Sequence, residues 1–345
     1  MLQIRLFRFD PRCDVASYFK PYVYESAPFA DLAALLDDIC AHDPYFSVQG
    51  VKFVKIGGTT VSVKEPLDTL IAHFGSELII SPLSEKESIK DLRCEPRAFL
   101  DKFKAFESIA DAADFEFYKS LAPYFYSTKI PACSREFLGN SAFIFAHRLM
   151  QTHPSERMRI LEIIEPQMAY FTKCNAVGME FDDRAAYRAF CDILKFEPAR
   201  SNKILSAQSM AEFDAAGTKH DFSGFNVAVW YDEAAEELAS RLGAQIVHFG
   251  CEGAPLGAQI YERERECALR LGGEILFDAF DSGSDFLLLN SKLALDFLDG
   301  KSDEIQRLFG RDLAGFYIIT TDELIALARG ERPDFSARKL KPTLI

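Results

Sequence analysis

Residues 51–64, VKFVKIGGTTVSVK, decide the fold of the N-terminal part of this 345-residue chain. Apolar and polar residues alternate on both sides of the glycine pair at 57–58, and such a pair between two alternating runs is typical of a β-hairpin. A second hairpin precedes it, because the runs LQIRLFRF at 2–9 and YFKPYVY at 18–24 flank a turn that begins at Asp10. The sequence therefore predicts two hairpins near its beginning.

The segments around these hairpins complete a small domain. Apolar residues between 32 and 39 have the spacing of one helix face, and Leu67–Phe74 is predicted to be a shorter helix. The run ELIIS at Glu77–Ser81 is predicted to be the closing strand. The resulting order β-β-α-β-β-α-β is that of a β-grasp ferredoxin-like domain, which we place at residues 1–94.

Residues 95–205 have a different pattern, because their apolar residues recur at helical spacing with few strand signals. We predict an all-α domain here. Its helices are expected at 98–106, 108–121, 141–152, 156–164 and 182–194. The polar, small-residue stretch 206–221 then predicts a linker or a loosely packed connection.

From residue 222 to residue 345, strand patterns alternate with helix patterns, which predicts an α/β domain with a parallel sheet. The glycine pair at 272–273 is expected to end a helix and lead into a strand at 273–280. The other strands are expected at 225–231, 244–249 and 315–320. The predicted fold class is therefore α+β and multidomain, with domains at 1–94, 95–205 and 222–345.

Composition narrows the function classes. The 39 Lys and Arg residues against 52 Asp and Glu residues give a net charge of −13, and no basic cluster suggests a nucleic-acid or membrane surface. Apolar runs such as Phe286–Leu289 are far shorter than the roughly 20 residues that span a bilayer. The first five residues, MLQIR, have a strand pattern and not that of a signal peptide. We therefore expect a cytoplasmic protein without nucleic acid and without direct membrane insertion.

The eight cysteines are widely spaced, and no C-x-x-C motif occurs. Metal and iron–sulfur sites usually take two or more ligands from one short loop. Most of these thiols are therefore predicted to be ordinary core or surface residues. Their positions are Cys13, Cys40, Cys94, Cys133, Cys174, Cys191, Cys251 and Cys267.

Four landmarks between residues 2 and 180 resemble the iron–sulfur subunit of succinate dehydrogenases and fumarate reductases. They are LFRFDP at 6–11, LIISPL at 78–83 followed by IKDL at 89–92, FLGNSA at 137–142 leading to AHR at 146–148, and the Glu-Arg pair at 156–157. They follow the order of that family. The resemblance implies a β-grasp domain followed by a helical ferredoxin domain.

The C-terminal part resembles a different family. Residues 227–256 are similar to the cysteine-rich "CCG" module of heterodisulfide reductases, and residues 316–330 resemble the last strand and helix of that module. A succinate-dehydrogenase-like subunit fused to this module is the layout of the iron–sulfur subunit of thiol:fumarate reductases. The resemblance thus extends to the order of the two parts.

The cluster ligands implied by these resemblances are missing. In the first domain they would lie near Pro44, Gln49 and Lys52 and between residues 61 and 64, but the window 41–64 contains no cysteine. The second motif would lie within 118–130, which also lacks cysteine and leaves Cys133 alone beyond it. Cys174 matches one member of the last ferredoxin motif, whereas Cys251 matches one of the paired CCG cysteines and Glu252 replaces the other. Because an iron–sulfur cluster needs three or four thiolates, we expect no cofactor.

Two hypotheses of function follow. The first is a non-catalytic, cluster-free paralogue of an iron–sulfur electron-transfer subunit. It would act as a scaffold or interaction protein, with a protein partner in a respiratory or heterodisulfide-reductase-like complex. The bulky residues Tyr124, Phe125 and Tyr126 would then refill the space of a lost cluster.

The alternative is a thiol-dependent redox enzyme or small-ligand binder that uses the loop at 250–255. Its candidate residues are Cys251 and Glu252, with His248 and Asp278 nearby. An adjacent carboxylate raises the pKa of a thiol and disfavours the reactive thiolate.

Overall fold

The computed structural model describes residues 1–197, 203–214 and 217–342. Its fold is mixed α/β, and its sheets include parallel strands. Two units are distinguished by their internal contacts. The first unit comprises Met1–Pro131, Leu138–Ile164 and Cys174–Ala189, and the second comprises Ala132–Phe137, Glu165–Lys173 and Phe190–Ile345. The domain boundaries expected at residues 94 and 205 stay predictions.

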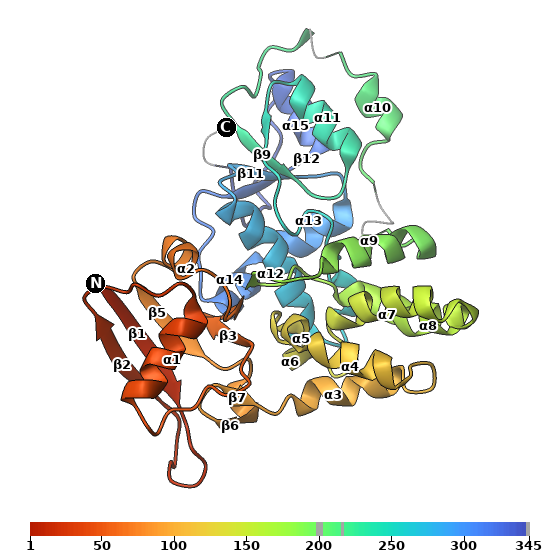
Figure 1. The fold of residues 1–345 in the computed structure, drawn as a ribbon. Coiled ribbons are helices and arrows are strands. Elements are labelled where there is room, and N and C mark those ends of the chain that lie inside the picture. Colours follow the sequence, from red (N-terminus) through yellow and green to blue (C-terminus); the bar gives the residue numbers. More distant parts are fainter. Residues whose placement is uncertain (198–202, 215–216, 343–345) are drawn as a thin grey trace. The chain divides into compact units, whose positions relative to one another are not determined.

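The first unit contains a sheet with the strand order β2-β1-β5-β3-β4-β8 (Figure 1). Its strands are β1 (Leu2–Arg8), β2 (Tyr18–Tyr24), β3 (Phe53–Ile56), β4 (Thr59–Ser62), β5 (Glu77–Ser81) and β8 (Ala176–Val177). Strand β1 is antiparallel to β2 and parallel to β5, and β3 is antiparallel to β4. Both predicted hairpins and the closing strand are therefore confirmed. The short strand β8, which pairs with β4, corrects the expectation that residues 95–205 are entirely helical.

Two helices pack on one face of this sheet. Helix α1 (Leu32–His42) begins where the Asp31 carboxylate accepts a hydrogen bond from the Ala34 amide at 2.8 Å. Helix α2 (Leu67–Phe74) ends at Gly75, whose φ of 82° favours glycine. The two helices bury leucine and isoleucine side chains against those of the strands, and this contact forms the core. The core includes Leu2, Ile4, Leu6, Leu32, Leu35, Leu36, Ile39, Leu67, Leu70, Leu78 and Ile80.

A helical region rich in aromatic residues lies mostly in the first unit, although its residues 132–133 and 190–194 belong to the second. Its helices are α3 (Arg97–Lys102), α4 (Ala112–Ser120), α5 (Ala122–Tyr126), α6 (Ile130–Cys133), α7 (Ser141–Thr152), α8 (Arg157–Ile164) and α9 (Asp183–Leu194), and the hairpin β6 (Ser88–Lys90) and β7 (Arg93–Cys94) precedes them. The rings of Phe99 and Tyr118 stack with their centroids 4.4 Å apart. Tyr124 and Phe125 are also buried. These aromatic residues fill the interior of the region.

The second unit is built on a parallel sheet with the order β10-β9-β11-β12. Its strands are β9 (Asn226–Val229), β10 (Gln245–Ile246), β11 (Phe286–Leu289) and β12 (Tyr317–Thr320), and its helices are α10 (Ala207–Ala211), α11 (Glu233–Arg241), α12 (Arg265–Asp281), α13 (Lys292–Leu298), α14 (Ser302–Phe309) and α15 (Thr321–Ala328). Strands alternate with helices, as the sequence predicts. Strand β10 is shorter than the expected run at 244–249.

The predicted strand at 273–280 is wrong, because these residues form the second half of α12. Gly272 and Gly273 lie inside this helix and do not end it. A Cβ atom on Gly273 would lie 2.3 Å from the Phe309 ring, so glycine permits the close approach of α14. A short apolar run cannot by itself distinguish a buried strand from a buried helix.

Buried charges fix the loop that follows α1. The Arg8 guanidinium, on β1, forms ion pairs with Asp43 and, at 2.9 Å, with Asp91, and each of the three side chains is at most 5% exposed. Asp43 also accepts hydrogen bonds from Lys20 at 2.7 Å and from the Tyr22 hydroxyl at 2.6 Å. These contacts fasten the end of α1 and the turn at Asp91 to the sheet.

We predict that Arg8→Met lowers the free energy of unfolding by about 3–5 kcal/mol, because it removes the buried cation that Asp43 and Asp91 share and leaves Asp43 only the partly exposed Lys20 as a charged partner. Arg5→Met on the same strand is the control, since Arg5 is exposed, and it is expected to change stability by no more than about 0.5 kcal/mol. Urea denaturation of both variants at pH 7 measures the difference. Equal stability of the two variants would contradict the assignment.

The cost of Arg8→Met is also expected to shrink on acidification. Burial alone would raise the pKa of Asp43, but the hydrogen bonds that it accepts hold this pKa below the ordinary value. The associated stabilisation is present above the unfolded-state pKa of about 4 and is lost as the pH falls below it. The difference in the free energy of unfolding between the wild type and the variant is therefore expected to stay constant between pH 7 and pH 5 and to become smaller toward pH 3, as denaturation series at these pH values measure.

Candidate functional site

The loop that carries Cys251 lies beyond β10 in the second unit. The Trp230 indole N–H donates a hydrogen bond to the Ala254 carbonyl at 3.1 Å, and the Tyr231 amide donates to the Glu252 carbonyl at 3.0 Å. Both contacts fasten the loop to the residues that follow β9. Proteins with parallel α/β sheets bind ligands at loops beyond the carboxyl ends of strands. The Cys251 loop has this location.

Asp278 organises the loop from helix α12. Its carboxylate accepts a hydrogen bond from the Cys251 amide at 2.7 Å and forms an ion pair with Lys173 Nζ at 2.9 Å. A Cβ atom on Gly250 would lie 2.2 Å from Cδ of Lys173, so glycine lets the lysine side chain cross the loop. The arrangement is a cysteine amide, a carboxylate and a lysine held together.

The Cys251 thiol is enclosed. The residue is 1% exposed, and its Sγ lies 3.9 Å from the hydroxyl of Thr172. Burial and then the nearby carboxylates of Asp278 and Glu274 raise the pKa of Cys251 well above its ordinary value. A thiol is nucleophilic as the thiolate, so the structure holds Cys251 in its unreactive form at neutral pH.

The structure places the other predicted residues of this site in two groups. Asp278 contacts the backbone of Cys251, as expected from its proposed nearness, but it lies on a helix and not on a strand. Glu252 instead forms a contact of 3.2 Å with His248. Thr172 and Lys173 were not predicted, because nothing in their local sequence indicates a contact with residues 79 and 105 positions away.

We predict that N-ethylmaleimide labels Cys251 at pH 7 at least about a hundredfold more slowly than Cys13, because a buried thiol reacts only after local opening. Cys13 is exposed and serves as the internal control. Mass spectrometry of tryptic peptides measures both rates, and labelling in denaturant should make them similar. Rapid labelling of native Cys251 would instead favour the hypothesis of a reactive thiol.

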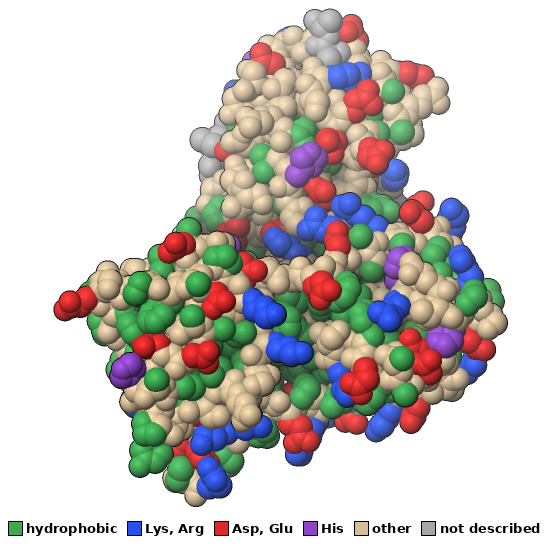
Figure 2. Space-filling model, viewed as in Figure 1, with side chains coloured by type: hydrophobic (Ala, Val, Ile, Leu, Met, Phe, Trp, Pro, Cys, Tyr) green, Lys and Arg blue, Asp and Glu red, His purple; other side chains and the backbone are tan. Residues whose placement is uncertain are grey.

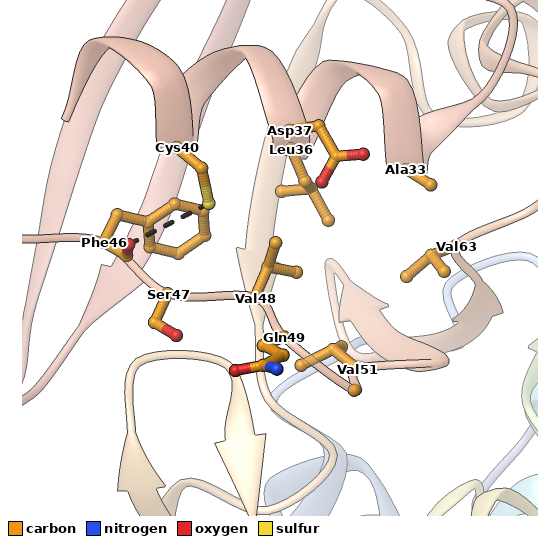
Figure 3. Close-up of a pocket in the computed structure, with 11 residues that line it drawn as sticks. Ala33, Leu36, Asp37, Cys40, Phe46, Ser47, Val48, Gln49, Val51 and Val63 are labelled. Carbon is orange, nitrogen blue, oxygen red and sulfur yellow. Dashed lines mark hydrogen bonds between the residues drawn. The ribbon is translucent and has the colours of Figure 1, made fainter. Parts of the chain in front are cut away.

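A second site position is a pocket in the first unit, where the resemblance implies a cluster. The pocket has a volume of about 490 Å³ and lies between α1 and the following loop (Figure 3). It is lined by Ala33, Leu36, Asp37, Cys40, Phe46, Ser47, Val48, Gln49, Gly50, Val51 and Val63. Figure 3 shows the Cys40 sulfur directed toward the Phe46 carbonyl, to which it donates a hydrogen bond at 3.9 Å.

An iron–sulfur cluster does not fit this pocket. Its lining offers one thiol, that of Cys40, whose pKa is raised chiefly by burial. A cluster requires three or four thiolates that converge on one centre. Aliphatic and aromatic side chains, such as Phe46 and Val48, line the pocket instead.

Cys174 lies in a buried polar network of the first unit. The Asn140 amide group donates hydrogen bonds to the Cys174 sulfur at 3.4 Å and to the Asp183 carboxylate at 2.6 Å. The Cys174 thiol donates to the Tyr124 carbonyl at 3.8 Å. Burial raises the pKa of both Cys174 and Asp183. The network thus holds the Cys174 thiol by hydrogen bonds within the protein.

One group in the described part of the chain has spacing suited to a metal ion, and it contains no cysteine. The ligand atoms of Asp111, Asp114 and His153 lie within 4.8 Å of one another. The two aspartates form a reciprocal capping box at the beginning of α4, and His153 contacts Asp114 at 2.6 Å. Their hydrogen bonds therefore serve to cap the helix.

This chain is similar in fold to a solved protein, whereas its sequence has no match among families or curated proteins. The structure is similar to that of a hypothetical protein from Helicobacter pylori, with 15% sequence identity and a TM-score of 0.54 over 100% of this chain and 98% of that chain. A chain of the Mycobacterium smegmatis Sdh1 complex in the apo form matches with 14% identity and a TM-score of 0.40 over 56% of this chain and 97% of that chain. Across the described residues, every helix is too short or too polar to cross a membrane.

Proposed function

We propose that this chain is a non-catalytic, cluster-free paralogue of an iron–sulfur electron-transfer subunit. It acts as a scaffold or interaction protein within a redox complex of the respiratory or heterodisulfide-reductase-like kind. The observation that carries the proposal is the pocket beside α1, which lies where the sequence resemblance implies a cluster. Its lining combines one thiol, that of Cys40, with apolar side chains and with Asp37, Ser47 and Gln49.

The fold supports the proposal. The strand order β2-β1-β5-β3-β4 of the first unit agrees with a β-grasp ferredoxin-like domain. The aromatic helical region agrees with a ferredoxin-type helical domain whose cluster space is refilled by Tyr124 and Phe125. The parallel sheet of the second unit agrees with a domain related to the CCG module of heterodisulfide reductases.

The thiols support the same proposal. Cys40, Cys174 and Cys251 each lie at or beside a position that the resemblances link to a cluster, and burial is the largest cause that raises each pKa. Cluster ligands must lose their protons. The one candidate metal group of the described residues contains no cysteine, whereas a cluster needs three or four thiolates. Under the proposal the scaffold therefore conducts no electrons.

An exposed apolar strip on β2 supports a role in interaction. Phe19 and Val23 are 37% and 61% exposed, and they lie on the same side of β2 as Pro21, at the edge of the sheet. The strip lies on the side of the sheet opposite α1, because Val23 and Pro21 pair with Gln3 and Arg5 and not with the core residues of β1. Figure 2 shows the side on which α1 lies, where apolar and charged side chains are mixed. Pro21 lacks an N–H group and so hinders pairing of another strand with this edge. We infer that a protein partner packs against the side chains of this strip.

We predict that Val23→Glu reduces capture of the partner by about tenfold, which corresponds to a loss of about 1.4 kcal/mol in binding free energy. A tagged full-length chain would be expressed in the native cell and purified under mild conditions. Met158→Glu is the matched control, because Met158 is 68% exposed and lies on α8. Circular dichroism of each variant checks that its fold is intact.

The expected result is a stoichiometric co-purifying redox subunit with the wild type and with Met158→Glu, and a depleted one with Val23→Glu. If the three forms capture the same subunit equally, the strip is not the interaction surface. If none of them captures a redox subunit, the proposed role as a scaffold of such a complex is wrong.

A further inference from the structure

Cys133 and Cys267 are distant in sequence but adjacent in the second unit. Cys133 is the last residue of α6, and Cys267 lies in the first turn of α12. A hydrogen bond between their thiols is the largest influence on the pKa of each. Cys133 is partly exposed, whereas Cys267 is buried. Two thiols in contact, one of them accessible, have the arrangement of a redox-active pair.

Polar and aromatic contacts fix the segment after Cys133 against the beginning of α12. Arg263 forms an ion pair with Glu136 at 3.2 Å, and it donates a hydrogen bond to the Tyr170 hydroxyl at 2.7 Å. The Phe137 ring stacks on Tyr170, with the ring centroids 5.5 Å apart. The nearness of the two cysteines therefore agrees with independent contacts between the same segments.

We propose that Cys133 and Cys267 form a reversible disulfide when the protein meets a low-molecular-weight disulfide. In the first step the Cys133 thiolate attacks one sulfur of that disulfide, the sulfur–sulfur bond breaks, and one small thiolate leaves. In the second step Cys267 loses its proton and attacks the Cys133 sulfur, which releases the second small thiolate. Two protein thiols are oxidised, the small disulfide is reduced to two thiols, and these take up the two protons.

The roles of the two residues follow from their surroundings. The hydrogen bond from Cys267, aided by the Arg270 guanidinium, lowers the pKa of Cys133, so this accessible thiol ionises first. The same hydrogen bond and burial raise the pKa of Cys267. Cys267 is therefore the resolving thiol, which acts only after Cys133 has been modified. This inference is independent of the proposed scaffold role.

Trypsin makes the test direct, because each cysteine lies in its own short peptide. Cleavage after Lys129 and Arg135 releases residues 130–135, and cleavage after Arg265 and Arg270 releases residues 266–270. The native full-length protein would be incubated with oxidised glutathione, blocked with N-ethylmaleimide in denaturant, digested and analysed by mass spectrometry. We expect the two peptides to be joined by a disulfide that a reductant removes. Exposed Cys13 should carry glutathione instead.

Two variants test the order of the steps. Cys267→Ser should stop the reaction at a glutathione adduct on Cys133, whereas Cys133→Ser should leave Cys267 reduced. Cys191→Ser, the matched control at a partly exposed cysteine, should retain the joined peptides. The proposal is overturned if wild-type Cys133 keeps glutathione while Cys267 is blocked by N-ethylmaleimide. It is equally overturned if both residues stay reduced while Cys13 reacts.

Discussion

A buried guanidinium, that of Arg8, bridges the carboxylates of Asp43 and Asp91, and the loop between α1 and β3 depends on this bridge. An iron–sulfur cluster would cross-link such a loop through metal–thiolate bonds. Here the cross-link consists of protein charges, and the Asp91 carboxylate also accepts a hydrogen bond from the Ser47 amide at 3.0 Å. All three charges are buried. Removal of any one of them takes away part of the attraction that compensates the desolvation of the remaining charges. The loop thus has a source of order that requires no metal.

In the second unit, polar contacts within the protein likewise hold the Cys251 loop. The Asp278 carboxylate joins the Cys251 amide to the Lys173 ammonium group, and the Trp230 indole holds the far side of the loop. The sulfur itself is buried and protonated. In each unit, polar contacts within the protein hold a segment that the family resemblances link to a cluster. Under the proposal, this common feature lets the scaffold keep its structure without cluster ligands.

Local patterns predicted much of the fold. The glycine pair at 57–58 marks its hairpin, and the apolar spacing of Leu67–Phe74 predicts this helix to the residue. The prediction failed at residues 273–280, where the glycine at 273 lies inside α12 and leaves room for the Phe309 ring, a contact between distant segments that no local pattern indicates. The same limit applies to the site. Cys251 was identified from its loop, but its contacts with Thr172 and Asp278 join segments that no local pattern connects.

Iron content and electron paramagnetic resonance of anaerobically purified full-length protein test the central claim most directly. The account predicts substoichiometric iron, no broad visible absorbance and no paramagnetic signal after reduction with dithionite. It also predicts that an iron chelator leaves the thermal unfolding midpoint unchanged, since Arg8, Asp43 and Asp91 hold the loop. Stoichiometric iron together with a signal from a reduced cluster would contradict the account and identify the chain as an electron carrier.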